Sequence, residues 1–347
     1  MKQLLTFNPG PSYLSEDVQN DIVEITQSGL LSVSHRTPLF QEITKGALDG
    51  LKRNFNIPDS SKVVFHHSAT GAMETILRNF VHTKSGHIVQ GAFANRFHQT
   101  ADQLGLETEL KVFPKTAPIP VDTLHFSSDT ELICLTHNET SNGSMWPNSA
   151  LKTLQDNHKD HLICHDLTSS FGGVKIDWEL ADIWFLSVQK CLGLPSGLGI
   201  IILNEQAEAR LLNHTLPSWQ HLPTMISKME QFQTVETPNV FLISLLEKQM
   251  KRWNSEQIEQ QINENYLYLL SHKTLWKPFL NDSDWHSKTV LNLLVDNPSF
   301  FHKHAKEHGI TLGSGYGDFK TNCIRIANFP SLTKKHFSEL INIFKEV

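Results

Sequence analysis

The chain has little of three things that would each point to a class of protein. It has four cysteines in 347 residues, widely spaced and in or beside apolar runs, which favours buried reduced thiols over a disulfide framework. No apolar run approaches the roughly 20 residues that span a bilayer, and the first residues lack the apolar core of a signal peptide. These absences predict a cytoplasmic protein that does not enter a membrane.

The chain also has fewer basic residues than acidic ones, 30 against 36. The formal net charge of −6 argues against a nucleic-acid partner, since such proteins normally present a basic patch. Nineteen histidines invite the idea of a metal site, but pairs such as His66-His67 and His302-x-His304 lack the companions that zinc sites require. We therefore predict neither nucleic-acid binding nor a bound metal.

Apolar runs alternate with helix-compatible stretches over most of the chain. The hydrophobic content of 39 % is enough for a sizeable core, and the length suggests two domains. Strands that alternate with helices predict an α/β fold with a mostly parallel sheet covered by helices on both faces. The strand-like runs are 63–65, 87–89, 132–135, 162–164, 183–186 and 200–203, and the helix-compatible stretches between them include 71–81, 94–104 and 149–157.

Helices are predicted before and after this α/β region. Ser15 precedes a predicted helix that ends at Gly29, and Thr37-Pro38 opens a second one. A long amphipathic helix is predicted from about Leu245 to Leu270, followed by a smaller α+β unit with strands at 288–295 and 323–327 and helices at 299–308 and 331–344. We place a large domain at 1–250 and a small C-terminal domain at 251–347, leaving open whether roughly the first 15 residues pack with the small domain.

An aspartate and a lysine each end an apolar run. Asp166 closes the run that begins at His161, and Lys190 closes the run that begins at Ile183, ahead of a glycine-rich turn. An acid and an amine at the ends of neighbouring strands can hold opposite ends of one aromatic cofactor. Pyridoxal 5′-phosphate (PLP) is the cofactor whose chemistry needs that pair.

Two further turns follow predicted strands, where ligands of α/β sheets bind. Small residues at Ser68-Ala69-Thr70-Gly71 lead into a helix, and the backbone N–H groups there suit a phosphate. The stretch from Thr136 to Gly143 clusters hydroxyl and amide groups able to hydrogen-bond a cofactor hydroxyl. Taken alone, each segment is better explained as an ordinary satisfied turn.

In their order and spacing, these segments resemble the class V, fold-type-I PLP-dependent aminotransferases, and the phosphoserine aminotransferase group in particular. The resemblance extends from Phe7-Asn8-Pro9-Gly10-Pro11 to the segment 324–330. Its most specific pieces are Ser34-His35-Arg36, Asn138-Glu139-Thr140-x-x-Gly143 and Ser187-Val188-Gln189-Lys190.

The resemblance implies a role for each matching residue. Lys190 would form the Schiff base with PLP and carry protons, and Asp166 would pair with the pyridine nitrogen. Phe93 would stack on the cofactor ring, where relatives often have tryptophan. The remaining implied PLP contacts are Ala69, Thr70 and Gln189 at the phosphate, Thr140 at the phenolic oxygen, and Thr237 from the partner subunit of a homodimer with shared active sites.

Arginines would recognise the substrate, a small amino or keto acid. The resemblance implies that Arg325 forks onto the α-carboxylate and that His35 and Arg36 help to bind a distal anionic group. The phosphoserine group carries a further His-Arg pair shortly before the carboxylate arginine, whereas this chain has Asp318-Phe319. Lys320 is a candidate replacement for that phosphate contact.

The reaction expected from the resemblance converts 3-phosphohydroxypyruvate and glutamate to phosphoserine and 2-oxoglutarate. Three alternatives remain. The segment Gly313-Ser314-Gly315-Tyr316-Gly317 is more similar to alanine–glyoxylate-type aminotransferases. A class V lyase such as a cysteine desulfurase fits less well, because Gln189 stands where those enzymes usually have histidine and Cys323 lies in a predicted strand. A non-enzymatic binding protein would leave Lys190 and Asp166 structural.

Overall fold

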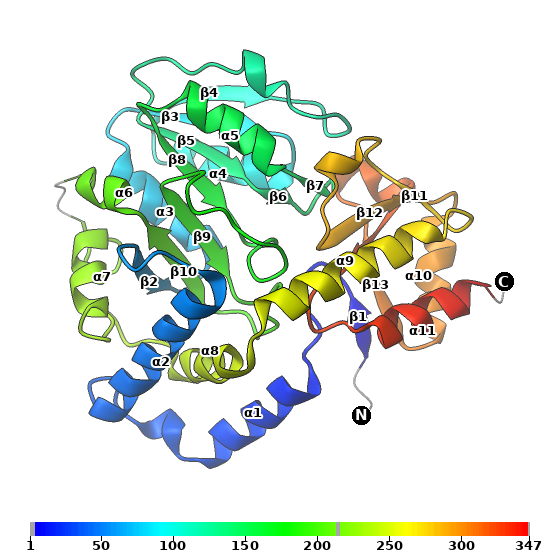
Figure 1. The fold of residues 1–347 in the computed structure, drawn as a ribbon, viewed down its shortest axis with the longest axis horizontal. Helices are drawn as coiled ribbons and strands as arrows, with labels where there is room; N and C mark the ends of the chain where they lie inside the picture. The colour runs from blue at the N-terminus through cyan, green and yellow to red at the C-terminus, as the bar shows by residue number, and fades with distance from the viewer. Residues whose placement is uncertain (1–3, 213–215, 346–347) are drawn as a thin grey trace.

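A computed structural model describes residues 4–212 and 216–345, which form two large β-sheets, each with its own hydrophobic core, and one further two-stranded sheet (Figure 1). The larger sheet has seven strands in the order β2-β10-β9-β8-β5-β3-β4. The pairs β9–β8, β8–β5, β5–β3 and β3–β4 are parallel, whereas β10 runs antiparallel to β9 and β2. The predicted, mostly parallel sheet is therefore confirmed. Its strands are β2 (Lys62–His66), β3 (Lys84–Val89), β4 (Glu107–Val112), β5 (Leu132–Thr136), β8 (Leu162–Asp166), β9 (Ile183–Ser187) and β10 (Gly199–Leu203).

The central strands are buried along their whole length because helices cover both faces of the sheet. Every residue of β5, β8, β9 and β10 is buried. This burial explains why those strands are continuous apolar runs without the alternation of a half-exposed strand. The helices of this part are α1 (Glu16–Gln27), α2 (Pro38–Phe55), α3 (Ala69–Phe80), α4 (Ala92–Gln103), α5 (Asn148–Asn157), α6 (Glu205–Ala209), α7 (Leu222–Met229) and α8 (Val240–Arg252).

Local capping chemistry fixes the ends of α2. The Thr37 side chain accepts a hydrogen bond from the Phe40 backbone, Pro38 is the first helical residue, and Asn56 ends the helix at a φ of 52°. Helix α8 then packs closely against it. A Cβ placed on Gly50 would lie 2.5 Å from the Met250 Cβ, so only glycine permits this approach.

The second sheet contains strands from both the N-terminal and the C-terminal parts of the chain. Its order is β1-β13-β14-β12-β11, with β1 parallel to β13, and Figure 1 shows the blue N-terminal strand among the orange and red C-terminal elements. Phe7 of β1 is fully buried and its ring lies 5.2 Å from that of Phe337. Residues 1–3 lie outside the described part of the chain. The elements are β1 (Leu5–Phe7), β11 (Lys277–Pro278), β12 (Val290–Leu294), β13 (Ile310–Ser314), β14 (Cys323–Ala327), α9 (Ser255–Ser271), α10 (Pro298–Glu307) and α11 (Lys334–Lys345).

The single long helix predicted from Leu245 to Leu270 is wrong. The structure has two helices there, α8 and α9, because Trp253 is extended with a ψ of 133° and Asn254 caps a new helix by accepting from the Gln257 backbone. The apolar periodicity continues across this break, and an internal asparagine cap is a weak signal beside it. The remaining short elements are β6 (Asn138–Glu139), β7 (Ser144–Met145), and 3₁₀ turns at Leu30–Ser32, Val121–Thr123, Ser283–Trp285 and Gly317–Thr321.

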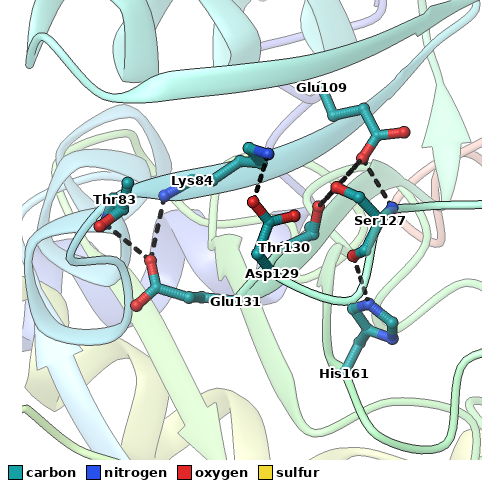
Figure 2. Close-up of polar contacts among 8 residues, drawn as sticks. All are labelled: Thr83, Lys84, Glu109, Ser127, Asp129, Thr130, Glu131 and His161. Atoms are coloured by element: carbon teal, nitrogen blue, oxygen red, sulfur yellow. Dashed lines mark hydrogen bonds and ion pairs between the residues drawn. The ribbon is translucent and has the colours of Figure 1, made fainter.

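A polar network holds the loop before β5 against β3 and β4, as Figure 2 shows. Glu131 Oε2 accepts hydrogen bonds from the backbone N–H groups of His82, Thr83 and Lys84, at 2.9, 2.7 and 3.0 Å. Glu109 Oε2 accepts from the Ser127 backbone at 2.9 Å. These carboxylates satisfy backbone donors at the edge of the sheet, where β4 has no further strand. Among the described residues, no helix is long and apolar enough to cross a bilayer.

Candidate active site

The parallel strands end at a cavity of about 270 Å³. Asp166 is the last residue of β8, Ser187 the last of β9 and Thr136 the last of β5, and all three line the cavity. The carboxyl ends of parallel strands are where α/β sheets bind ligands. Of the residues predicted for the site, the lining includes Ala69, Thr70, Phe93, Thr140, Asp166, Gln189 and Lys190.

Lys190 lies three residues beyond β9 and reaches back toward the N-terminal segment. Its Nζ donates a hydrogen bond to the Pro9 carbonyl. Gly10, with a φ of +123°, lies so close that a Cβ there would be 2.6 Å from Lys190 Nζ. Desolvation by burial, together with the positive charge of Arg325, lowers the pKa of Lys190 to about 8. A substantial fraction of the amine is therefore neutral near physiological pH.

Asp166 is also buried, and its pKa is shifted in the opposite direction from that of Lys190. Desolvation raises its pKa to about 6, although hydrogen bonds from Thr168 and the charge of Lys190 act in the other direction. Its Oδ1 accepts a hydrogen bond from the Thr168 backbone at 2.8 Å. A cationic ring nitrogen placed against this carboxylate would favour its ionised form.

The start of α3 forms a turn that is fixed on three sides. Ser68 accepts from the Gly71 backbone at 3.0 Å, and the Ala69 N–H donates to Ser187 Oγ at 2.8 Å. A Cβ on Gly199 would lie 2.7 Å from the Ser68 carbonyl carbon, so β10 passes directly behind the turn. Ala69 and Thr70, at the helix N-terminus, face the cavity where backbone dipoles favour an anion.

The position of Phe93 is fixed by a helix-capping contact that the sequence alone did not reveal. Helix α4 begins after Gly91, which has no side chain to cap it, and Glu139 takes over this function. Glu139 Oε2 accepts from the backbone N–H groups of Phe93 and Ala94, both at 3.0 Å. The same loop brings Thr140 into the cavity, where its Oγ1 donates to Ser169 Oγ at 2.9 Å.

Arg325, in the small domain, lies beside the cavity without lining it. In β14, its Nε donates to the Ser314 carbonyl at 2.7 Å and its Nη1 donates to the Thr140 carbonyl at 3.2 Å. Burial lowers the pKa of Arg325, and its charge in turn contributes to the lowered pKa of Lys190. The guanidinium therefore lies at the border between the two domains, beside the predicted cofactor contacts.

The structure does not bring His35, Arg36 or Thr237 to the cavity of their own chain. Arg36 is exposed, and its Nη1 donates to Gln233 Oε1 at 2.7 Å and to the Thr234 carbonyl at 3.2 Å. Thr237 lines a second cavity of about 250 Å³. Lys320 is exposed and does not line the first cavity.

Sequence reasoning missed Arg96, which lines the first cavity. Its position three residues after Phe93, on the same face of α4, was the available signal. Polar atoms of the lining, among them Thr136 Oγ1, Asn138 Oδ1 and Gln189 Oε1, are buried without a hydrogen-bond partner in the described structure. Such atoms, together with the amine and the carboxylate, suit a polar ligand of the PLP type.

The fold, with a large parallel-sheet domain and a small α+β domain, is that of the PLP fold-type-I enzymes. A lysine and an aspartate line the cavity at the ends of its parallel strands. The model of the family described as Aminotransferase class-V matches residues 5–275. The chain belongs to the class V aminotransferase family, so the predicted aminotransferase activity and fold are confirmed at that level.

Particular relatives support the same assignment. A phosphoserine aminotransferase of Rhodococcus opacus is 25 % identical over 96 % of this chain and 92 % of its own length. A crystal structure of a phosphoserine aminotransferase from Cytophaga hutchinsonii has 33 % identity and a TM-score of 0.94, covering 100 % of this chain and 99 % of that one. An alanine–glyoxylate aminotransferase from Nostoc sp. shares the fold at 19 % identity, with a TM-score of 0.86 and coverage of 100 % and 95 %.

Proposed function

We propose that this chain is a phosphoserine aminotransferase that uses PLP and exchanges the amino group between phosphoserine and 2-oxoglutarate. The observation that carries the proposal is that Lys190 and Asp166 line one cavity at the ends of the parallel strands, where burial lowers the pKa of Lys190 to about 8 and raises the pKa of Asp166 to about 6. Perturbed pairs of this kind cluster at catalytic sites. The relatives with matching full-length coverage support the choice of phosphoserine.

The residues present fit the cofactor. Asp166 would hold the pyridine nitrogen and Phe93 would cover the ring face, while Thr140 would contact the phenolic oxygen. Ala69, Thr70 and Gln189 would hold the phosphate at the N-terminus of α3. When bound, PLP supplies an electron sink that stabilises negative charge at the substrate Cα.

Lys190 is the residue proposed to move the proton. With a pKa lowered to about 8, its amine would be available to take the proton from the substrate Cα and to deliver it to the C4′ carbon of the cofactor. Arg325 would hold the α-carboxylate through its planar guanidinium and so orient Cα toward Lys190 Nζ. The same positive charge disfavours protonation of the lysine.

A homodimer would explain why Arg36 and Thr237 lie away from the cavity of their own chain. Both residues lie outside the cavity of their own chain, and both belong to one surface, because Arg36 bonds to the segment at residues 233–234 that leads to Thr237. We propose that this surface completes the cavity of a partner subunit, with Arg36 and His35 near the substrate and Thr237 near the cofactor phosphate. A cytoplasmic location is proposed from the four free, buried cysteines.

The cysteine desulfurase alternative finds no support in the thiols. Cys323 is buried in β14, and burial raises its pKa to about 12. Burial also raises the pKa of Cys191, beside the catalytic lysine, well above its usual range. A thiol held in its protonated form is a poor nucleophile. The alanine–glyoxylate alternative is left to experiment.

Spectroscopy of the purified protein tests the proposal. A visible absorbance band from bound PLP, discharged by phosphoserine and by glutamate, is the expected result. Absence of any band, or a band that no amino donor discharges, would contradict the aminotransferase assignment for this site. A fast response to alanine together with none to phosphoserine would instead favour the alanine–glyoxylate type.

Shared active sites have a separate test. Lys190→Ala and Arg36→Gln are each expected to be nearly inactive, but mixed dimers contain one site with both residues intact. If the subunits exchange freely, an equimolar mixture should recover about a quarter of wild-type activity. No recovery after verified subunit exchange would exclude a site built from both chains.

A further inference from the structure

Arg96 is a charged residue of the cavity to which no role has been assigned. Of the described residues that line the cavity, the charged ones are Arg96, Asp166 and Lys190. The carboxylate and the amine belong to the proposed cofactor chemistry. The Arg96 guanidinium makes no hydrogen bond or ion pair with another described residue, so its N–H donors are available to a ligand.

The position of Arg96 is nevertheless defined. Its guanidinium carbon lies 5.5 Å from the centre of the Phe93 ring, an arrangement that attracts a cation to an aromatic face and leaves the planar N–H donors free. Because Glu139 fixes the start of α4 at the Phe93 and Ala94 backbones, the helix turn that carries Arg96 is fixed as well.

Arg96 is also part of a chain of aromatic and guanidinium groups that crosses between the domains. The Phe93 ring lies 5.9 Å from the Tyr316 ring, and the guanidinium of Arg325 lies 5.5 Å from the centre of that second ring. The two arginines therefore approach opposite ends of one pair of contacting rings. One arginine lines the cavity and the other lies beside it, so the two offer separate contacts to a substrate with two anionic groups.

We propose that Arg96 binds the second anionic group of the substrate, the phosphate of phosphoserine or the γ-carboxylate of glutamate, while Arg325 binds the α-carboxylate. The proposal rests on the proposed function and deepens it, because it assigns selection of dianionic substrates to a residue of the same chain. Arg96 would also replace the phosphate contact of the His-Arg pair in the phosphoserine group, because this chain has Asp318-Phe319 at that place. Arg96 lines the cavity, whereas Lys320 does not.

The test is calorimetric binding of two unreactive ligands to the PLP-loaded protein. 3-Phosphoglycerate carries a carboxylate and a phosphate but no amino or keto group, and glycerate is the same acid without the phosphate. In Arg96→Gln we expect affinity for 3-phosphoglycerate to fall by about tenfold or more, with glycerate unchanged, because a charge-assisted contact is lost. Arg96→Lys should recover part of the affinity as a point charge. Arg53→Gln, an exposed arginine on α2 outside the cavity, is the matched control.

Several results would overturn the proposal. They include unchanged 3-phosphoglycerate binding in Arg96→Gln, a wild type that binds 3-phosphoglycerate no more tightly than glycerate, and loss of binding in Arg36→Gln but not in Arg96→Gln. Weakened uptake of PLP by the Arg96→Gln apoprotein, with 3-phosphoglycerate binding intact, would reassign the arginine to the cofactor phosphate. A wild type that takes up no PLP would defeat the proposed function, while the two ligands would still test Arg96 on the same protein.

Discussion

Gly10 and Lys190 are in such close contact that a methyl group on the glycine would clash with the lysine amine. A Cβ at Gly10 would lie 2.6 Å from Lys190 Nζ and 2.8 Å from its Cε. The N-terminal segment, which contributes β1 to the small-domain sheet, therefore also forms one wall around the lysine that we propose to be catalytic. The position of the amine therefore depends on the N-terminal segment.

Gly10→Ala should impair catalysis more than folding. The end of the lysine can move away from the new methyl group, but the amine then leaves its place in the cavity, and we expect kcat to fall by about tenfold or more. The positive φ adds strain of about 1–2 kcal/mol. Gly309→Ala is the control, since its φ is +73° and no atom lies within 4 Å of the added carbon. Equal losses of activity in the two variants would contradict a specific effect on Lys190.

Asp166→Asn should stabilise the apoprotein at pH 8 while abolishing activity. The carboxyl has a folded pKa raised to about 6, above its usual 3.8, so wild-type stability falls as pH rises from about 4 to 6. Asparagine removes the buried charge and keeps an oxygen that accepts from the Thr168 backbone. We expect urea unfolding to show a gain of about 1–3 kcal/mol at pH 8 and little at pH 4.

Asp182→Asn is the matched control for that experiment. Asp182 is also buried with a raised pKa, but both of its oxygens accept hydrogen bonds, from the Ile163 backbone at 2.9 Å and from Asn204 at 3.0 Å. Replacing one acceptor by an NH₂ group should destabilise the protein. A gain at pH 8 in Asp182→Asn equal to that in Asp166→Asn would show that the effect is general to buried aspartates and not a property of the site.

The sequence predicted the chemical pair of the site because Asp166 and Lys190 each end an apolar run, and the ends of adjacent strands lie at one edge of a sheet. Arg96 could not be predicted in the same way, since an arginine on a helix is usually a solvated charge. The cap of α4 was equally hidden, because Gly91 has no capping side chain and Glu139 is distant in sequence. Strand β4 was missed because its charged residues reflect an exposed sheet edge.

Acid should weaken the network at the sheet edge through Glu109. Burial alone would raise the pKa of this carboxyl, but hydrogen bonds from Ser127, Lys111 and Thr130 outweigh that effect and lower its pKa to about 2. A depressed folded pKa gives stability that is present above pH 4.5 and is lost as pH falls toward 2. Because solvent screens this site, Glu109→Gln should cost roughly 1 kcal/mol at pH 7 and less at pH 3, measured by urea unfolding. A loss that is independent of pH would contradict an electrostatic origin.

Glu139→Gln should damage the site, whereas Glu131→Gln should not. Both oxygens of Glu139 accept hydrogen bonds, Oε2 from the Phe93 and Ala94 backbones and Oε1 from Ser141. An amide can replace one of these oxygens, so buried donors lose a partner and we expect a loss of about 2–3 kcal/mol together with weaker PLP binding. At Glu131, the hydrogen bonds to the backbone at residues 82–84 all go to Oε2, and a glutamine oxygen can take its place. Thermal unfolding and cofactor titration of the two variants measure the difference, and equal effects on PLP affinity would contradict a positioning role for Glu139.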